Sequence, residues 1–544
     1  MSPENPEKRK DERREEPPKE PSFASDAPAT LTTGEDSNVA RVARGAGIST
    51  AGQGIGRALG FVTQSVLARS LGSQSFGLYT LGIAVVTAAQ IVSQFGLDNG
   101  VVRYVAHYRG QDDPARVRGT ILQAVGFTFA ISLVVAAFMF FGAGTIAGFY
   151  QPELEPVIRA FAFALPFYAL MSIILWSTQG FQTVTYATYT QQILRPLIYF
   201  ALLVGLYFVG ASLVGVVVAY ALSMLVGVAI GLFFLRRLFP PLTDPKAPAK
   251  FETRALFGVS VPMSVSRATQ YANNWTAVLV LGLFYPAGVV GVFQAAFRTA
   301  TLSTLVRFAF NGIFSPIISS LHSREMSDDL GGLYKDVTRW TFTGAFAVFL
   351  GIVLLAREAL TVFGGAEFAA GATALVIVAA AQLYSASVGP ASRMLAMTGN
   401  QNALMWITLT GAATGVAASF ALIPSLGLVG AAFGAAAAIV TENTLTLIFV
   451  RRRLGFWPYS VAFWKPLLAG LGAAGTVLLV ELLAPDLPLL VNVALVAATF
   501  GAVFVGLLLA FGLTPTDREF VGEFAKVGRK ALRRARRLAG RRRG

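Results

Sequence analysis

The sequence predicts an all-α polytopic membrane protein with about 14 transmembrane helices. Of its 544 residues, 54% are hydrophobic and only 13% are charged, whereas a soluble chain carries about a quarter charged residues. Apolar segments follow one another between residues 46 and 513, and each has roughly the 20 residues that a helix needs to cross a bilayer. Short polar gaps between these segments alternate in charge along the chain. These observations predict repeated membrane crossings.

Each expected helix coincides with one apolar segment and ends at the next polar gap. In chain order the predicted spans are 46–71, 75–97, 119–142, 156–179, 190–209, 211–235, 256–283, 288–315, 338–356, 370–390, 402–423, 426–450, 464–484 and 489–512. The polar leader before the first span does not resemble a cleavable signal peptide.

The charges of the gaps predict the orientation. The basic set contains Arg103, Arg109, Arg116, Arg118, Arg236, Arg237, Lys246, Lys250, Arg324, Lys335, Arg339, Arg451, Arg452 and Arg453. The alternate gaps contain Glu153, Glu155, Glu367 and Asp486, with few basic residues. Because basic loops remain in the cytoplasm, we expect both termini to be cytoplasmic in a cell (plasma or inner) membrane.

A weak internal repeat divides the chain. Arg57 and Gln64 correspond to Arg267 and Asn274, Gly77-Leu-Tyr79 to Gly291-Val-Phe293, and Asn99-Gly100 to Asn311-Gly312. The order of these matches predicts two parallel six-helix lobes, related by an axis along the membrane normal. The expected organisation is a disordered leader (1–44), a first lobe (45–240), a second lobe (241–455), two additional helices (456–513) and a basic amphipathic tail (514–544).

Composition excludes several kinds of chemistry. The chain has no cysteine, and its two histidines are His107 and His322, so disulfides, iron–sulfur clusters and zinc sites are not expected. It has neither a phosphate-binding P-loop nor a nucleophile elbow. We therefore predict no catalytic residues, cofactor or metal. The net charge of +15 is concentrated in the tail, which we expect to bind anionic lipid rather than nucleic acid, or merely to enforce topology.

Polar side chains form stripes within four of the predicted spans. The stripes comprise Gln53, Arg57, Gly60 and Gln64; Thr80, Thr87, Gln90, Gln94 and Asp98; Ser260, Ser264, Arg267, Gln270 and Asn274; and Thr304, Arg307 and Asn311. Arg298 precedes Arg307 by nine residues, about 180° on a regular helix, so the two are not expected to point the same way.

An arginine at mid-bilayer costs about 2.5–3.5 kcal/mol and therefore faces a cavity or a partner. The stripes predict a water-filled cationic cavity for an anionic substrate, because guanidinium binds phosphate in a bidentate fork. Glu442 is the clearest embedded acid, and Glu442 and Asp98 are candidates for coupling. A structural role, in which an arginine pairs with one of these acids, remains open. Arg69, Arg195 and Arg339 lie near predicted helix ends, where snorkelling to the interface is expected.

The segment "GRALGFVTQSVLARSLGSQSFGLYTLG", followed by "FGLDNGVVRYVAHY", resembles the start of the Wzx-type polysaccharide flippases. These belong to the multidrug/oligosaccharidyl-lipid/polysaccharide exporter superfamily. The resemblance implies two six-helix lobes in a V, a central cationic cavity, alternating access and a polyprenyl-phosphate or polyprenyl-diphosphate sugar as substrate. Lipid II flippases share the Arg57-Ala58-Leu59-Gly60-Phe61 pattern but usually have a second arginine where this chain has Thr63.

We therefore predict a flippase that moves a polyprenyl-linked oligosaccharide from the cytoplasmic to the outer leaflet for glycan assembly. Its phosphates would bind Arg57, Arg267 and Arg307, with Arg298 as a further candidate. Its sugar hydroxyls would bind the amides of the stripes. Glycosyltransferases or a polymerase of the same pathway are expected partners. A cation-coupled drug antiporter, a lipid II-type flippase and, less favoured, a membrane glycosyltransferase remain alternatives.

Overall fold

The computed structural model describes residues 35–210, 212–483, 488–512, 514 and 516–518. The side chains of residues 35–51, 243, 261–262, 308–313 and 315–316 are outside this description. The residues from Gly45 onward form one compact unit, separate from Met1–Arg44. Residues 1–34 of the leader that we expected to be disordered, most of the basic tail and Asp486 therefore lie outside the described residues, whereas the last part of that leader forms the start of a helix at Glu35.

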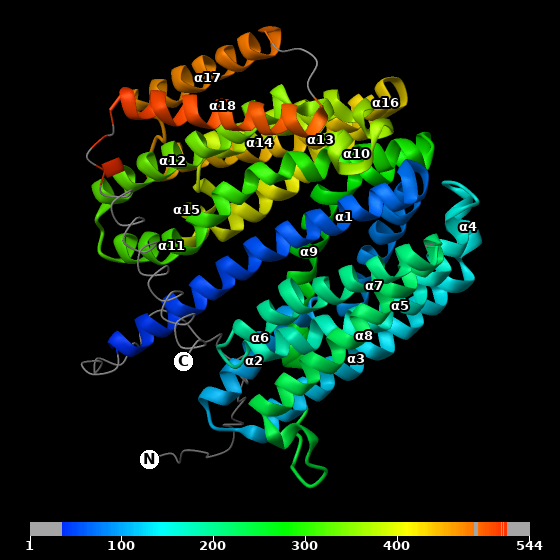
Figure 1. Ribbon diagram of the computed structural model, residues 1–544. Coiled ribbons are helices and arrows are strands. Elements are labelled where there is room, and N and C mark those ends of the chain that lie inside the picture. The colour runs from blue at the N-terminus through cyan, green and yellow to red at the C-terminus, as the bar shows by residue number, and fades with distance from the viewer. Residues whose placement is uncertain (1–34, 211, 484–487, 513, 515, 519–544) are drawn as a thin grey trace, which may run out of the picture. The chain divides into compact units, whose positions relative to one another are not determined.

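All regular elements in the described ranges are helices (Figure 1). The α-helices are α1 (Glu35–Gln94), α2 (Leu97–Gly110), α3 (Pro114–Phe141), α4 (Ala143–Gly148), α5 (Leu154–Gln179), α6 (Thr185–Thr188), α7 (Arg195–Val209), α8 (Leu213–Leu238), α9 (Thr253–Phe284), α10 (Ala287–Ala300), α11 (Thr304–Ser323), α12 (Ser327–Leu354), α13 (Ala356–Gly364), α14 (Ala372–Val388), α15 (Ala391–Met397), α16 (Gln401–Leu454), α17 (Trp464–Leu483) and α18 (Leu489–Ala510). A π-helix, η1 (Tyr189–Leu194), and the 3₁₀ turns η2 (Pro240–Thr243), η3 (Thr301–Ser303), η4 (Ala366–Gly371) and η5 (Val461–Phe463) complete the set.

Eleven helices within the described residues are long and apolar enough to cross a membrane, which confirms the predicted fold class. Two of them, α1 and α16, contain a kink at Gly72 and Gly427, where the backbone adopts a positive φ. Glycine tolerates this conformation at no steric cost, so each long helix provides room for two of the predicted crossings. The polar helix α9 is not among the eleven, and the count of 14 stays a prediction.

The largest hydrophobic cluster of the core joins the two predicted lobes. The largest cluster combines Leu67 and Phe161 of the first lobe with Phe293 and Leu375 of the second. At the end that carries the basic loops, the cluster around Val105 combines first-lobe residues with Leu256 of α9, and a separate cluster around Tyr334 lies in the second lobe. The helix α9 therefore joins the lobes at this end as well.

Two glycines from corresponding repeat positions meet where the lobes join. A Cβ added to Gly77 would lie 1.7 Å from the carbonyl oxygen of Ala287, four residues before Gly291. A Cβ added to Gly291 would lie 2.3 Å from the carbonyl oxygen of Ser73, four residues before Gly77. Such a reciprocal contact is what a two-fold relation produces. The predicted repeat therefore has a symmetric contact at these positions.

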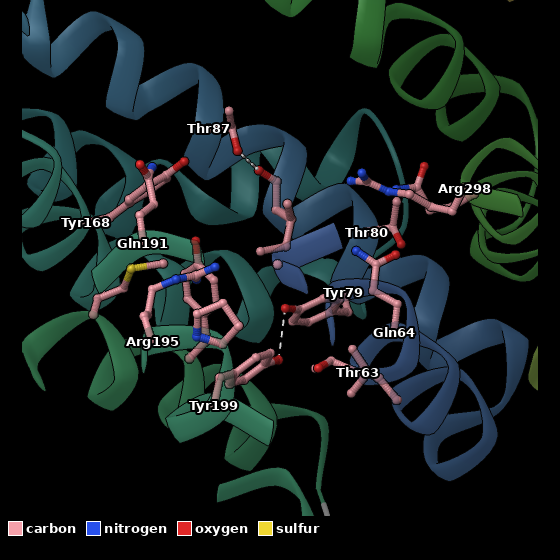
Figure 2. A pocket seen from close by; sticks show the side chains of 18 of the residues that line it. Thr63, Gln64, Tyr79, Thr80, Thr87, Tyr168, Gln191, Arg195, Tyr199 and Arg298 are labelled. Carbon is pink, nitrogen blue, oxygen red and sulfur yellow. Dashed lines mark hydrogen bonds between the residues drawn. The ribbon is translucent and has the colours of Figure 1, made fainter. Parts of the chain in front are cut away.

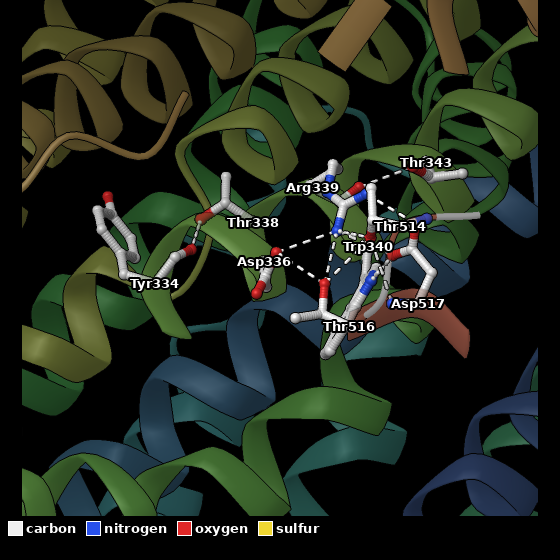
Figure 3. Close-up of polar contacts among 9 residues, drawn as sticks. All are labelled: Tyr334, Asp336, Thr338, Arg339, Trp340, Thr343, Thr514, Thr516 and Asp517. Carbon is white, nitrogen blue, oxygen red and sulfur yellow. Dashed lines mark hydrogen bonds and ion pairs between the residues drawn. The ribbon is translucent and has the colours of Figure 1, made fainter. Parts of the chain in front are cut away.

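The additional helices α17 and α18 pack on α12 through a separate core that includes Phe346, Ala473 and Phe500. Beyond α18, Asp517 forms an ion pair with Arg339 of α12 and accepts a hydrogen bond of 2.7 Å from Trp340 Nε1 (Figure 3). Arg339 also pairs with Asp336. The snorkelling predicted for Arg339 is wrong, because this side chain is buried between two carboxylates.

Candidate substrate cavity

A polar cavity of about 920 Å³ lies between α1 and the second lobe. Its arginines are Arg57 of α1, Arg298 of α10, Arg307 of α11 and Arg393 of α15. Amides and hydroxyls from α9, α14 and α16 complete the lining: Gln270, Asn273, Asn274, Gln382, Ser385, Thr408 and Asn443. The volume is at the upper end of the 300–1,000 Å³ typical of ligand sites.

Hydroxyls hold two of the arginines in place. Arg57 Nη1 donates to Thr304 Oγ1 over 3.2 Å, which links the first predicted lobe to the start of α11. Arg307 Nη1 donates to Ser385 Oγ, which in turn donates to Asn443 Oδ1 over 3.0 Å. These hydroxyls help to fix the two guanidinium groups. Both arginines also line the cavity, where an anion can contact them.

Arg298 and Arg307 both line the cavity, so the expectation that they point in opposite directions is wrong. That expectation assumed one regular helix. The chain instead leaves α10 at Ala300, passes through the 3₁₀ turn Thr301–Ser303 and begins α11 at Thr304. The tighter turn changes the angular phase of the residues that follow it.

Glu442 is the single carboxylate among the described lining residues. Asn273 Nδ2 donates to Glu442 Oε2 over 3.4 Å, and the Cβ of Glu442 packs close to Gly411 within the kinked helix α16. With four arginines and one carboxylate, the lining carries a strong positive charge. A negatively charged ligand is favoured by this balance.

The predicted polar residues separate into two groups in the structure. Gln64, Gln270 and Asn274 line the cavity together with the arginines. Gln53, Gln90 and Gln94 are not part of its lining, and the Gln94 amide lies 3.5 Å from the carbonyl oxygen of Ala169. Asn311 belongs to α11, but its side chain is outside the description. Of the first polar stripe, the part from Arg57 to Gln64 therefore lines the cavity.

Arg267 is not among the residues that line this cavity. Its guanidinium forms an ion pair with the buried carboxylate of Asp98 and sits over the Trp176 ring, 4.9 Å from the ring centroid. Next to this pair, a Cβ added to Gly96 would lie 2.0 Å from the carbonyl oxygen of Ser260. Arg267 thus fastens α9 to α2 and α5, as the structural alternative in the sequence analysis describes. The repeat partners Arg57 and Arg267 have different surroundings.

Sequence reasoning missed Arg393 because it lies in the short helix α15, beyond the predicted end of the tenth span at 390. Gly389, with a φ of 72°, turns the chain there, and Arg393 enters the cavity lining. A basic residue close after a Gly-Pro pair was the available signal, since such a pair marks a break in a membrane helix.

A second cavity of about 350 Å³ adjoins the first and lies largely in the first lobe (Figure 2). Gly56, Gly60, Gln64, Gln192 and Arg298 line both cavities. Arg195, Gln191 and a group of aromatic rings line the smaller one alone: Tyr79, Tyr168, Tyr199, Tyr220 and Trp275. The two cavities therefore share one wall.

The expectation that Arg195 snorkels from a helix end is wrong. The crossing helix begins at Thr185, well before the predicted start at 190, and Arg195 follows the π-helix within it. Arg69 is exposed and donates hydrogen bonds to the carbonyl oxygens of Thr361 and Val362. This contact satisfies the last carbonyls of α13.

Comparison with known proteins agrees with this architecture. The chain is 22% identical over 392 residues to the probable low-salt glycan biosynthesis flippase Agl15 of Haloferax volcanii, covering 72% of this chain and 79% of the relative. It is 24% identical over 495 residues to the stage V sporulation protein B of Bacillus subtilis, covering 85% and 93%.

The solved structure of the lipid II flippase MurJ, in an inward closed conformation, has the same fold. It superposes with a TM-score of 0.63 at 14% identity, over 85% of this chain and 99% of that one. The family model "Polysaccharide biosynthesis protein" matches residues 42–322, just over half of the chain. With its helical membrane fold and cationic cavity, the chain belongs to the polysaccharide biosynthesis protein family.

Proposed function

We propose that this protein is a flippase that moves a polyprenyl-(di)phosphate-linked oligosaccharide from the cytoplasmic to the outer leaflet of a cell membrane. The observation that carries the proposal is the large cavity in the membrane region, where four arginines oppose one carboxylate. Phosphate gains most from such a site, because each guanidinium offers a planar fork of donors. The flippase relative Agl15 supports the same activity.

In this proposal, Arg57, Arg307 and Arg393 bind the phosphates of the substrate, with Arg298, at the wall shared with the smaller cavity, as a further candidate. Gln270 and Asn274 of α9 also line the cavity and bind sugar hydroxyls, with Asn311 as a further candidate. The prenyl chain stays in the lipid and passes between helices, because an apolar chain gains nothing by entering a cavity lined with amides and arginines. Arg267 supports α9 and does not bind the substrate.

The clusters around Val105 and Tyr334 stay separate from each other, although α9 of the second lobe packs into the first of them, and this separation supports a pathway from the end with the basic loops. Apolar packing joins the lobes at the opposite end, so access there requires the lobes to part. Exchange between these two arrangements provides alternating access across the bilayer. We infer that the basic loops, and with them both termini, lie in the cytoplasm.

The rival functions fit the cavity less well. A drug antiporter that exports organic cations needs an anionic or neutral binding site, and this lining is cationic. A membrane glycosyltransferase needs carboxylates at the membrane face, whereas Glu442 is the one described carboxylate in the cavity. A lipid II-type flippase has the same phosphate chemistry and stays the second candidate, with the same fold as its support.

Partners follow from the same function. Enzymes that build the lipid-linked glycan must act before this protein, and a polymerase or ligase must use its product on the outer face. We expect glycosyltransferases of the same pathway nearby and anionic lipid at the C-terminal tail.

Complementation of surface-glycan assembly in a flippase-null strain tests the proposal. Arg57→Ala and Arg307→Ala should each remove most of the glycan at normal membrane abundance, and the lysine variants should retain part of it because the charge remains. Arg237→Ala, at the exposed end of α8, is the matched control and should complement fully. Full complementation by both cavity variants would refute the proposed role of the cavity.

A further inference from the structure

The smaller cavity contains polar atoms whose partners are missing from the protein. Within the described part of the chain, Gln64 Oε1, Arg195 Nε and Arg298 Nε are buried and have no hydrogen-bond partner. All three residues line this cavity. A buried polar group without a partner costs about 1–3 kcal/mol, and more if it is charged. Three such atoms around one space indicate a ligand that supplies the missing contacts.

The charge and walls of the cavity define that ligand. Arg195 and Arg298 are its charged residues, and no carboxylate is among its described lining. Figure 2 shows the two arginines entering from opposite sides, with Gln64 and Tyr79 between them. Aromatic rings, amides, threonine hydroxyls and a few aliphatic side chains such as Leu67 form the remaining wall, an arrangement that suits a ring with polar edges. The ligand is therefore an anionic, hydroxyl-rich ring.

Local structure explains why these side chains gather there. Gly52 and Gly56 allow α1 to lie against Thr188 and Gln192, since a Cβ on either glycine would clash with them. Arg195 follows the π-helix Tyr189–Leu194, and such insertions occur frequently at functional sites because they redirect side chains. The site is therefore built by backbone features of α1 and η1.

We propose that the smaller cavity is a specificity pocket for an acidic sugar of the transported glycan, with its carboxylate held between Arg195 and Arg298. This inference rests on the proposed flippase function and deepens it. Phosphate shares the anionic chemistry, but the phosphates of the substrate are attached to a prenyl chain. A cavity of about 350 Å³ is too small to hold such a chain. A sugar that is distant from the prenyl chain in the glycan can enter the cavity without it.

Ligand binding to the purified full-length protein tests the pocket. Saturation-transfer NMR compares methyl β-D-glucuronide with methyl β-D-glucoside, which differ only in the carboxylate. We expect the glucuronide to bind at least tenfold more tightly. Arg195→Gln should remove this difference, and the exposed control Arg237→Gln should keep it. Inorganic phosphate is the rival ligand, and its binding is measured by the broadening of its phosphorus NMR line.

The inference would be overturned if the glucuronide did not bind, or if both sugars bound equally well. It would also be overturned if Arg195→Gln removed the binding of phosphate while the binding of the glucuronide persisted. Translocation of a neutral lipid-linked oligosaccharide, measured separately, distinguishes this failure from failure of the proposed function. Arg195→Gln should leave neutral transport unchanged and slow the acidic substrate at least tenfold. Glucuronide binding without any lipid-linked transport would leave the pocket intact and refute the flippase.

Discussion

At the scale of single residues, the partner of each arginine decides its role. Arg57 and Arg307 donate to hydroxyls and line the cavity, whereas Arg267 faces the buried carboxylate of Asp98. An arginine whose charge is neutralised by a buried acid attracts an anionic substrate only weakly. The same residue type thus serves binding in one place and assembly in another.

The ion pair between Arg267 and Asp98 gives the first prediction. Arg267→Ala should lower membrane abundance sharply, because an unpaired buried carboxylate costs about 3–5 kcal/mol. Adding Asp98→Asn to the same chain should restore part of the abundance, since the remaining group is neutral. Quantitative membrane blotting of both variants is the measurement. Normal abundance of Arg267→Ala with lost transport would instead return Arg267 to the substrate site.

Glu442 gives the second prediction. It lines the cavity together with the arginines and accepts a hydrogen bond from Asn273. If it carries the coupling proton, Glu442→Gln should abolish the dependence of transport on the proton gradient while leaving abundance unchanged, because the amide has nearly the same shape but does not titrate in this range. Transport assays with and without an ionophore measure this. Gradient dependence that survives in Glu442→Gln would leave Glu442 a structural role.

At the scale of the helices, glycines determine how closely elements approach. Gly77→Ala should destabilise the contact between the lobes, because the new methyl group would overlap the carbonyl group of Ala287. Gly126→Ala in α3 is the control, since its Cβ would meet no atom within 4 Å. The control should be neutral or more stable by about 0.4–1 kcal/mol. Thermal unfolding in detergent compares the two, and an equal melting temperature would rule out this tight contact.

The residues after α18 form a pH-sensitive attachment to α12. Burial opposes ionisation of Asp517, but hydrogen bonds from Trp340, Arg339 and Thr514 together lower the pKa of its carboxyl. The stabilisation is therefore fully present above the ordinary aspartate value of about 3.9 and is lost as the pH falls through the lower folded value. The protection factors of the amides of residues 514 and 516–518, which correct for the intrinsic pH dependence of hydrogen exchange, should stay high at pH 5 and fall only in stronger acid. Loss of protection that begins already above pH 5 would contradict the attachment.

At the scale of the whole molecule, apolar length and loop charge were enough to predict the helical membrane fold. The cavity was predictable where an arginine interrupts a span, as with Arg57 and Arg307. Periodicity failed where the helix is irregular: the 3₁₀ turn after Ala300 shifts the phase of Arg307 so that it lines the same cavity as Arg298, and the π-helix before Arg195 brings that residue into the smaller cavity. Pairing is equally invisible in sequence, since Asp98 and Arg267 meet only through the fold.

Translocation in proteoliposomes tests the central claim most directly. The purified full-length chain is reconstituted with a polyprenyl-diphosphate-linked oligosaccharide, and a glycan-modifying enzyme outside the vesicles reports which leaflet holds the sugar. The wild type should make nearly all of the substrate accessible, Arg57→Ala/Arg307→Ala should slow this at least tenfold, and Arg237→Ala should match the wild type. Accessibility no faster than in protein-free vesicles, or an unimpaired double variant, would contradict a flippase that grips its substrate by these arginines.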